Sequence, residues 1–223
     1  MDVVVNAAMS VDGKLSTRRR GQLRISGEAD FDRVDRLRAA ADAVMVGVGT
    51  VLADDPQLTL DDDDRRVHRL RSGRPGNPAR VVADSRGRTP LDARILNDAA
   101  DTFLLVTDDT PESRTGALAD AGAQVLRVPA DDAGHVDLPA GLAALAAEGI
   151  DRLMVEGGGE LIASLFDEGL VDELSVYVGS LVVGGREAPT LVDGDGFVDD
   201  FPRLALRDVE RVDDGVVLRY DAT

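Results

Sequence analysis

The sequence contains no cysteine and no tryptophan, and it has only two histidines. Without cysteine the chain can form no disulfide, no thiolate nucleophile and no cysteine-ligated zinc site. The histidines, His68 and His135, lie in polar stretches, and neither has a partner histidine at ligand spacing. We therefore predict no metal site and expect both imidazoles to be solvated loop residues.

Long hydrophobic runs are also missing. No apolar stretch approaches the ~20 residues that a helix needs to cross a bilayer, and the first residues lack the basic and apolar regions of a signal peptide. We therefore expect a soluble, cytoplasmic protein with no membrane partner. The chain has 223 residues, of which 43% are hydrophobic, enough for a substantial core. It shows no repeat and no clear linker, so we predict a single domain over residues 1–223.

Positive charge is scarce. The 25 Lys and Arg residues face 42 Asp and Glu residues, which gives a formal net charge of −17. Such a surface repels nucleic acid, which we exclude as a partner. An excess of acid with almost no lysine is typical of a halophilic protein, because concentrated salt screens the self-repulsion. A phosphate-ester ligand would need its own local cluster of positive charge.

The one lysine of the chain, Lys14, lies in the stretch NAAMSVDGKL. Its presence in a chain that otherwise uses arginine has two explanations. Lys14 is either a chance survivor on a surface loop or part of a catalytic or phosphate-binding site in this turn. Only the motifs elsewhere in the chain can separate the two.

Short apolar runs alternate with helical stretches, which indicates an α/β fold with a mixed, mainly parallel sheet and helices on both faces. Since strands buried on both faces read as continuous β-branched runs, we predict strands at residues 2–7, 43–48, 79–83, 102–106, 124–128 and 152–155. A hairpin signal at Asp213-Asp214-Gly215 predicts antiparallel strands at the C-terminal end. Residues 61–77, with four consecutive aspartates, are predicted to be the least ordered.

Helices are predicted after Ser26, Thr110, Leu138 and Gly159. The first of them has Ser26 as its expected N-cap. Its expected apolar face is formed by Phe31, Val34, Leu37 and Ala41 at helical spacing.

Polar and small residues follow five of the predicted strands, at the edge of the sheet where open α/β folds bind ligands. In the clearest case, LMVEGGGEL, a strand runs through Glu156 and three glycines into a helix. Backbone N–H groups at a helix start suit a phosphate, and glycine permits close approach. The alternative is a tight turn with no ligand. Glu156 either hydrogen bonds a sugar hydroxyl or pyrimidine edge, or is a solvated carboxylate.

A second informative stretch is GVGTVLADDPQLT. Thr50 is either a donor to a phosphate or a simple N-cap. Asp54 can accept hydrogen bonds from ribose or amide groups, whereas Asp55-Pro56 can be a turn alone. Arg38, on the first helix, either points towards a substrate phosphate or is solvated.

Together these motifs resemble a known family. NAAMSVDGKL, ISGEADF, DAVMVGVGTVLADDPQLT, ARVVADSRGRTPLDARIL and VEGGGELIASLFDEGLVDELSVYVGSLVVGGREAPTLVDGDGF follow one another over nearly the whole chain. The sequence resembles the pyrimidine reductases of riboflavin biosynthesis in their stand-alone archaeal form, the 2,5-diamino-6-ribosylamino-4(3H)-pyrimidinone 5′-phosphate reductases. The resemblance implies a dihydrofolate-reductase-like fold, a homodimer, and NADPH, or in some members NADH, as cofactor. Residues 172–185 are one possible dimer interface.

The resemblance also implies which residues form the site. Asp12, Lys14 and Glu156 are the candidate proton donors, with Asp12 near the reacting sugar. Asn6 stands where bifunctional bacterial relatives have a lysine, so a proton-transfer role of that lysine does not carry over. The residues implied to bind substrate are Asn6, Arg38, Leu58 and Glu156, and those implied to bind the cofactor are Ala8, Thr50, Asp54, Ser85, Gly157, Gly158, Gly159, Glu160 and Leu161.

The reaction implied is reduction of a ribosyl group to a ribityl chain. The aminosugar ring opens to an imine, and hydride from the nicotinamide attacks C1′ of the imine. Most of the rate would come from placing the two reacting carbons together and excluding water. The alternatives are a dihydrofolate-reductase-like enzyme, since a fold does not fix a function, and a non-catalytic dinucleotide sensor.

Overall fold

The computed structural model describes residues 1–19, 21 and 23–223, and the chain divides into two compact units. The first unit holds residue 1 and residues 35–154, and the second holds residues 2–34 and 155–223. Helix α1 (Glu28–Ala40) and strand β6 (Arg152–Gly157) pass from one unit into the other. The single domain over residues 1–223 stays a prediction.

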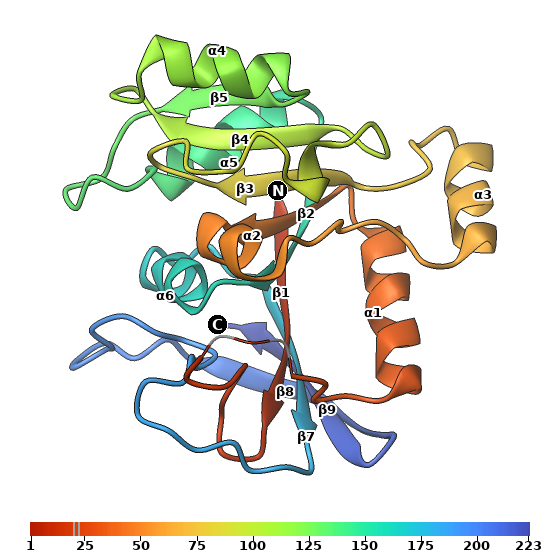
Figure 1. The fold of residues 1–223 in the computed structure, drawn as a ribbon. Helices are drawn as coiled ribbons and strands as arrows, with labels where there is room; N and C mark the ends of the chain where they lie inside the picture. The colour runs from red at the N-terminus through yellow and green to blue at the C-terminus, as the bar shows by residue number, and fades with distance from the viewer. Residues whose placement is uncertain (20, 22) are drawn as a thin grey trace. The chain divides into compact units, whose positions relative to one another are not determined.

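The first unit contains a parallel sheet of four strands in the order β5-β4-β3-β2 (Figure 1). In this sheet Val46 pairs with Val82, and Leu104 pairs with Val125. Strands β2 and β4 are buried over almost all of their length because their side chains are apolar on both faces. The four strands are β2 (Ala43–Gly47), β3 (Ala79–Ala83), β4 (Thr102–Thr107) and β5 (Gln124–Val128).

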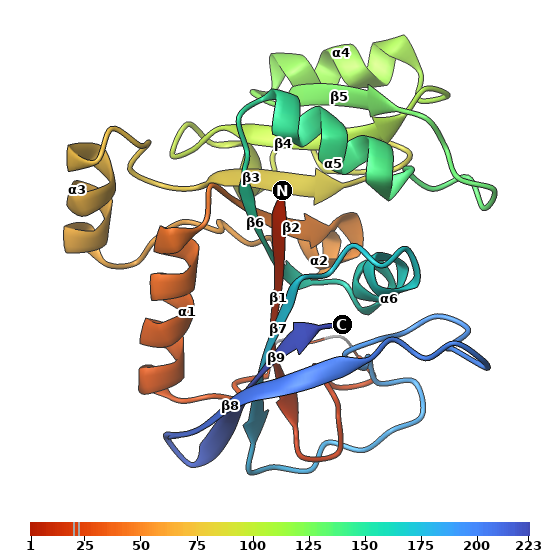
Figure 2. The same cartoon turned by 180° about the vertical axis from the view of Figure 1, so that it is seen from behind.

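Helices cover both faces of this sheet (Figures 1 and 2). On one face, Leu104 and Leu118 are fully buried in a cluster that includes α2 (Val48–Asp54), the 3₁₀ turn η1 (Arg94–Leu96) and α4 (Glu112–Asp120). On the other face lies α5 (Leu138–Ala147), where a Cβ at Gly141 would be 3.0 Å from Leu105 Cδ1. Each fully buried leucine side chain stabilises such a core by roughly 1.5–3 kcal/mol.

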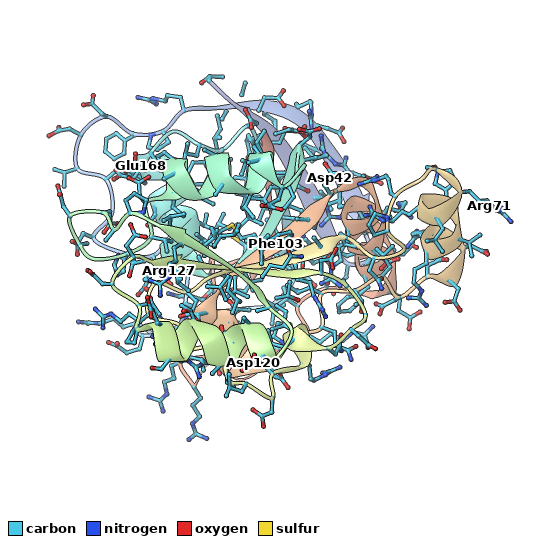
Figure 3. The ribbon with its side chains drawn as sticks, turned by 90° about the horizontal axis from the view of Figure 1, so that it is seen from above. Asp42, Arg71, Phe103, Asp120, Arg127 and Glu168 are labelled. Carbon is cyan, nitrogen blue, oxygen red and sulfur yellow. The ribbon has the colours of Figure 1, made fainter. Side chains whose placement is uncertain are left out.

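Figure 3 shows the same division between inside and outside. Phe103 of β4 lies among the strands, while Asp120 at the end of α4 and Arg127 on β5 lie towards the outside. The alternation of apolar and charged residues along the chain therefore agrees with the layers of the first unit.

The prediction that residues 61–77 are the least ordered is wrong. They contain α3 (Asp63–Arg71), whose N-cap Asp62 accepts hydrogen bonds from Asp64 N at 2.8 Å and Arg65 N at 3.2 Å. Arg69 is 2% exposed, and its guanidinium donates to Ala39 O at 2.8 Å and Ala41 O at 2.7 Å. A side-chain cap and a buried arginine on backbone carbonyls hold this segment, so it needs little apolar surface.

The second unit contains four strands in the order β1-β7-β9-β8. Strands β1 and β7 are parallel, and the two later pairs are antiparallel, which confirms the antiparallel C-terminal strands. In the hairpin, Asp213 has φ +50°, and a Cβ at Gly215 would lie 2.5 Å from Tyr177 Oη. The unit also holds α6 (Gly159–Asp167); its strands are β1 (Asp2–Ser10), β7 (Glu173–Gly179), β8 (Leu204–Val212) and β9 (Gly215–Ala222).

The four predicted helices are present, but α1 does not use Ser26 as its N-cap. The helix begins at Glu28, and the Asp213 carboxylate of the hairpin accepts from Ala29 N at 3.4 Å and Asp30 N at 3.1 Å. A Cβ at Gly27 would lie 2.5 Å from Asp213 Cγ, so glycine leaves room for this carboxylate. Asp213, which is distant in sequence, therefore accepts the hydrogen bonds from the start of α1 that were predicted for Ser26.

Candidate active site

The turn from β6 into α6 lies in the second unit. Gly158 is the N-cap of α6 with φ +96°, a conformation that favours glycine. Since glycine has no side chain, the N-cap residue itself gives the first N–H groups of α6 no acceptor. Gly157 and Leu161 are buried and Glu160 is exposed. This turn has the form of an anion site.

Gly159 has a second reason to be glycine. A Cβ on Gly159 would lie 2.5 Å from Asp193 Oδ2 and 2.7 Å from Thr190 O. Asp193 N donates to Gly159 O at 3.1 Å, and Asp193 Oδ1 accepts from Thr190 N at 2.9 Å. The loop of residues 190–193 thus packs directly on the first residue of α6.

Asp12 forms hydrogen bonds to an earlier part of the same loop, at residues 183–184. Its carboxylate accepts from Ser10 Oγ at 2.6 Å, Val183 N at 3.0 Å and Gly184 N at 2.7 Å. These hydrogen bonds, that from Ser10 first, lower the pKa of Asp12 from 3.8 to about 2. The side chain is exposed yet ionised at neutral pH, which disfavours Asp12 as a proton donor.

We expect the carboxyl signal of Asp12, followed by NMR, to titrate near pH 2. Because the folded-state pKa lies below the unfolded value of about 3.9, the contribution of Asp12 to stability is complete above the unfolded value. It is lost as pH falls through about 2. In Asp12→Asn this acid-dependent step should vanish. A carboxyl signal that titrates near pH 4 would show that the carboxylate does not hold the loop.

Lys14 contacts the same loop from the same turn. Its Nζ donates to Ala188 O at 3.2 Å, its backbone N–H donates to Ser10 Oγ at 2.9 Å, and it forms an antiparallel bridge with Thr190. Since residues 190–193 pack on Gly159, the turn at residues 10–14 connects through this loop to the start of α6. Lys14 is therefore not a detached surface residue.

Asn6 belongs to a buried polar cluster in the second unit. Its Oδ1 accepts from Arg33 Nη2 at 3.0 Å, and Arg33 also donates to Ser175 Oγ at 2.8 Å and to Asp30 Oδ1 at 2.7 Å. The four residues are between 1% and 6% exposed. Sequence reasoning found Asn6 and missed the other three. The i, i+3 spacing of Asp30 and Arg33 was the available signal.

Ala8 and Glu156 are two further predicted site residues in the second unit. Ala8 lies two residues beyond Asn6 on β1 and packs against the cluster of Ile25, Tyr177, Val212 and Val217. Glu156 is half-buried on β6, next to the glycine turn. Both therefore lie on strands, each one residue beyond the predicted end of its strand.

In the first unit, Thr50 is the third residue of α2 and not its N-cap, which is Gly47. Asp54 is the last residue of α2, and burial raises the pKa of its carboxyl group. Ser85 Oγ accepts from Val136 N at 3.0 Å, and Ser85 O accepts from Thr107 Oγ1 at 2.8 Å. Thr50 and Asp54 thus lie on a short helix, and Ser85 lies on a loop that is held by hydrogen bonds.

Arg38 and Leu58 also lie in the first unit. Arg38 Nη1 donates to Thr59 O at 3.0 Å. Leu58 has φ +52°, an uncommon conformation for a branched side chain, and its side chain is 5% exposed in the apolar cluster around α2. A ligand would therefore meet the backbone of Leu58 and not its side chain.

Among the described residues, no group of three or more His, Asp or Glu residues is arranged to hold a metal ion. Within the same residues, no helix has the length and apolar character needed to span a membrane.

Comparison with known proteins shows which family this chain is similar to. The model of the RibD C-terminal domain matches residues 2–218. The 2,5-diamino-6-ribosylamino-4(3H)-pyrimidinone 5′-phosphate reductase of Archaeoglobus fulgidus is 47% identical over 213 residues, which cover 96% of this chain and 94% of that protein. The reductase of the same name from Methanothermobacter thermautotrophicus is 43% identical over 220 residues, covering 98% and 96%.

Among solved structures, a pyrimidine reductase-like protein from Corynebacterium diphtheriae has a TM-score of 0.85 at 19% identity. The match covers 100% of this chain and 92% of that one, and at this identity it shows the fold alone. RibD of Acinetobacter baumannii matches with a TM-score of 0.78 at 28% identity over 100% of this chain and 58% of that one. The predicted dihydrofolate-reductase-like α/β fold is confirmed.

Proposed function

The chain belongs to the RibD C-terminal domain family, and we propose from this membership that it is an oxidoreductase of riboflavin biosynthesis. The proposed reaction is the NADPH-dependent reduction of the ribosyl group of 2,5-diamino-6-ribosylamino-4(3H)-pyrimidinone 5′-phosphate to a ribitylamino group. The observation that carries the proposal is the nearly full-length match to two archaeal reductases of that name.

The residues present fit a nicotinamide dinucleotide, which when bound supplies the hydride that reaches C1′ of the ring-opened imine. The N–H groups after Gly158, at the positive end of α6, suit its pyrophosphate, since the N-cap glycine offers them no side-chain acceptor. We propose NADPH as the cofactor, with NADH as the other possible donor.

We propose a division of the proton roles from the contacts that each side chain makes. Because Asp12 is ionised and fastens residues 183–184, we propose that it positions this loop and does not act as the acid. Lys14 donates to Ala188 O and has two further N–H groups. We propose Lys14 and Glu156 as the groups that hold the proton needed at the opening sugar.

We propose that the protein is a cytoplasmic, halophilic homodimer. The suggested interface at residues 172–185 is a poor choice, because β7 is paired on both sides by β1 and β9. Within the described residues β8 pairs with β9 alone, and Leu206 and Val209 on it are 57% and 56% exposed. An edge strand with exposed apolar side chains suits an interface.

Leu206→Glu is expected to convert the dimer into a monomer, because it places a charge in the apolar part of that interface. Analytical ultracentrifugation in concentrated KCl measures the change. Val182→Glu, at a side chain 74% exposed outside β8, is the matched control and should leave the mass unchanged. A Leu206→Glu variant that still sediments as a dimer would exclude β8.

The assay of the proposed function is NADPH oxidation in concentrated KCl on addition of the diaminopyrimidine ribosylamine phosphate, with the product mass as second readout. Substrate-dependent oxidation and a ribityl product are expected. Turnover of dihydrofolate alone would favour the dihydrofolate-reductase-like alternative. Saturable NADPH binding without turnover of either compound would favour the dinucleotide sensor.

A further inference from the structure

The side-chain amide of Asn6 has its orientation fixed by Arg33. A guanidinium group has five N–H donors and no acceptor, so only Oδ1 of the amide can face it, and the distance from Arg33 Nη2 to Oδ1 is 3.0 Å. The amide nitrogen Nδ2 must then point to the other side. This assignment of the two amide atoms follows from the chemistry of the partner.

Arg33 is itself held in place by two other partners. It donates to Ser175 Oγ at 2.8 Å, and Ser175 is the residue that pairs with Asn6 across strands β1 and β7. It also donates to Asp30 Oδ1 at 2.7 Å, one turn earlier on α1. Because the Asp30 carboxylate balances the guanidinium, the cluster presents a neutral amide with no net charge behind it.

Asn6 Nδ2 donates no hydrogen bond within the described part of the chain, although the residue is only 5% exposed. In that same part, Arg80 Nε is the unpaired side-chain atom that is fully enclosed, so Nδ2 retains some access to a ligand. A polar group held in a nearly buried position without a partner is unfavourable and calls for an explanation. An acceptor supplied by a ligand provides one.

We propose that Asn6 Nδ2 donates a hydrogen bond to an uncharged acceptor of the substrate, and that Arg33 is the positioning residue that keeps this donor turned towards it. The inference rests on the proposed function and deepens it. The acceptor is a carbonyl oxygen, ring nitrogen or sugar oxygen of the pyrimidinone riboside. An amide that could flip would present either Nδ2 or Oδ1 to the substrate. The fixed amide presents only Nδ2, so it selects against a substrate that has a hydrogen-bond donor in that position.

Asn6→Asp tests the donor in a side chain of the same size. The variant keeps an oxygen that faces Arg33 and replaces the outward N–H groups with an acceptor, and it adds a negative charge beside the pair of Asp30 and Arg33. Sites built to hydrogen bond a substrate lose orders of magnitude when the partner is mismatched, so kcat/KM for the pyrimidine substrate should fall about 100-fold or more. The Kd of NADPH should stay unchanged.

Asn97→Asp is the control for placing a carboxylate next to an arginine, at an exposed position. Asn97 Oδ1 also accepts from an arginine, Arg80 Nη1, at 2.9 Å, but Asn97 lies outside every element assigned to the site. This variant is expected to keep its kcat/KM. The donor role of Asn6 is overturned if Asn6→Asp keeps kcat/KM within threefold of the unmodified protein.

Arg33 is tested through its dependence on Asn6. Arg33→Gln replaces a donor-only group with an amide that can face either amide atom of Asn6, so kcat/KM should fall about tenfold or more. Arg33→Lys has donors only and should recover most of that loss. In an Asn6→Ala background Arg33→Gln should not lower kcat/KM further. If kcat/KM falls by the same factor in that background, Arg33 has a merely structural role and its positioning role is overturned.

Calorimetric titration with the substrate separates this inference from the proposed function. If the unmodified protein binds and reduces the substrate and Asn6→Asp does both equally well, only the inference fails. If the unmodified protein neither binds nor reduces the substrate, the proposed function fails and the inference fails with it. Should Arg33→Gln not fold, Asn6→Asp still decides, because it leaves the ion pair of Asp30 and Arg33 intact.

Discussion

Replacing Gly159 with alanine is expected to weaken NADPH binding tenfold or more and to destabilise the protein by about 1–3 kcal/mol, the usual range for an overpacked site. The added Cβ would lie 2.5 Å from Asp193 Oδ2 and 2.7 Å from Thr190 O. A carboxylate could rotate away, but a backbone carbonyl moves only with its loop. The N–H groups at the start of α6 would shift as well. Fluorescence titration with NADPH and thermal unfolding measure the two effects.

Gly116→Ala is the control for this substitution. Gly116 lies in the middle of α4, where an added Cβ would meet no described atom within 4 Å. Alanine in place of glycine inside a helix stabilises by roughly 0.5–1 kcal/mol, so Gly116→Ala should raise the Tm and leave NADPH binding alone. If Gly159→Ala also leaves NADPH binding unchanged and does not lower the Tm, the loop of residues 190–193 moves aside at little cost in free energy.

The strands were predictable because their buried side chains are apolar on both faces. The runs at Ala43–Gly47 and Thr102–Thr107 have few polar residues, so composition alone identifies them. The same reasoning failed at residues 61–77, where a capped helix is held by Arg69 on backbone carbonyls. Polar composition was taken as a sign of disorder, and the partners that satisfy these polar groups lie elsewhere in the chain.

Helix α1 shows the same limit at the site. Hydrophobic periodicity placed Phe31 on the buried face, yet Phe31 is 50% exposed and lies under the guanidinium of Arg24, 5.4 Å from the ring centroid. The buried positions of α1 are Asp30, Arg33 and Asp35. A pattern that scores only apolar residues cannot detect a buried face made of paired charges, so it missed the partner of Asn6. The N-cap from Asp213 was equally invisible, being 183 residues away from Asp30.

Arg33→Met is expected to destabilise the protein by about 3–5 kcal/mol, because removing one partner of a buried ion pair leaves the other charge unpaired. Asp30 is 1% exposed and bonded to Arg33 Nε at 2.7 Å. The substitution also leaves Asn6 Oδ1 and Ser175 Oγ without their donor. Urea unfolding at neutral pH gives the difference in the free energy of unfolding.

The double substitution Asp30→Leu with Arg33→Met distinguishes the lost ion pair from lost packing. Replacing both members of a buried pair by apolar groups is often neutral, so the double variant should recover most of the stability that Arg33→Met loses. Its activity should stay low, because no donor then fixes the amide of Asn6. Stability that returns without activity would separate the two roles of Arg33, the neutralisation of Asp30 and the orientation of Asn6. If the double variant is no more stable than Arg33→Met, the loss arises from packing around the guanidinium and not from the unpaired carboxylate.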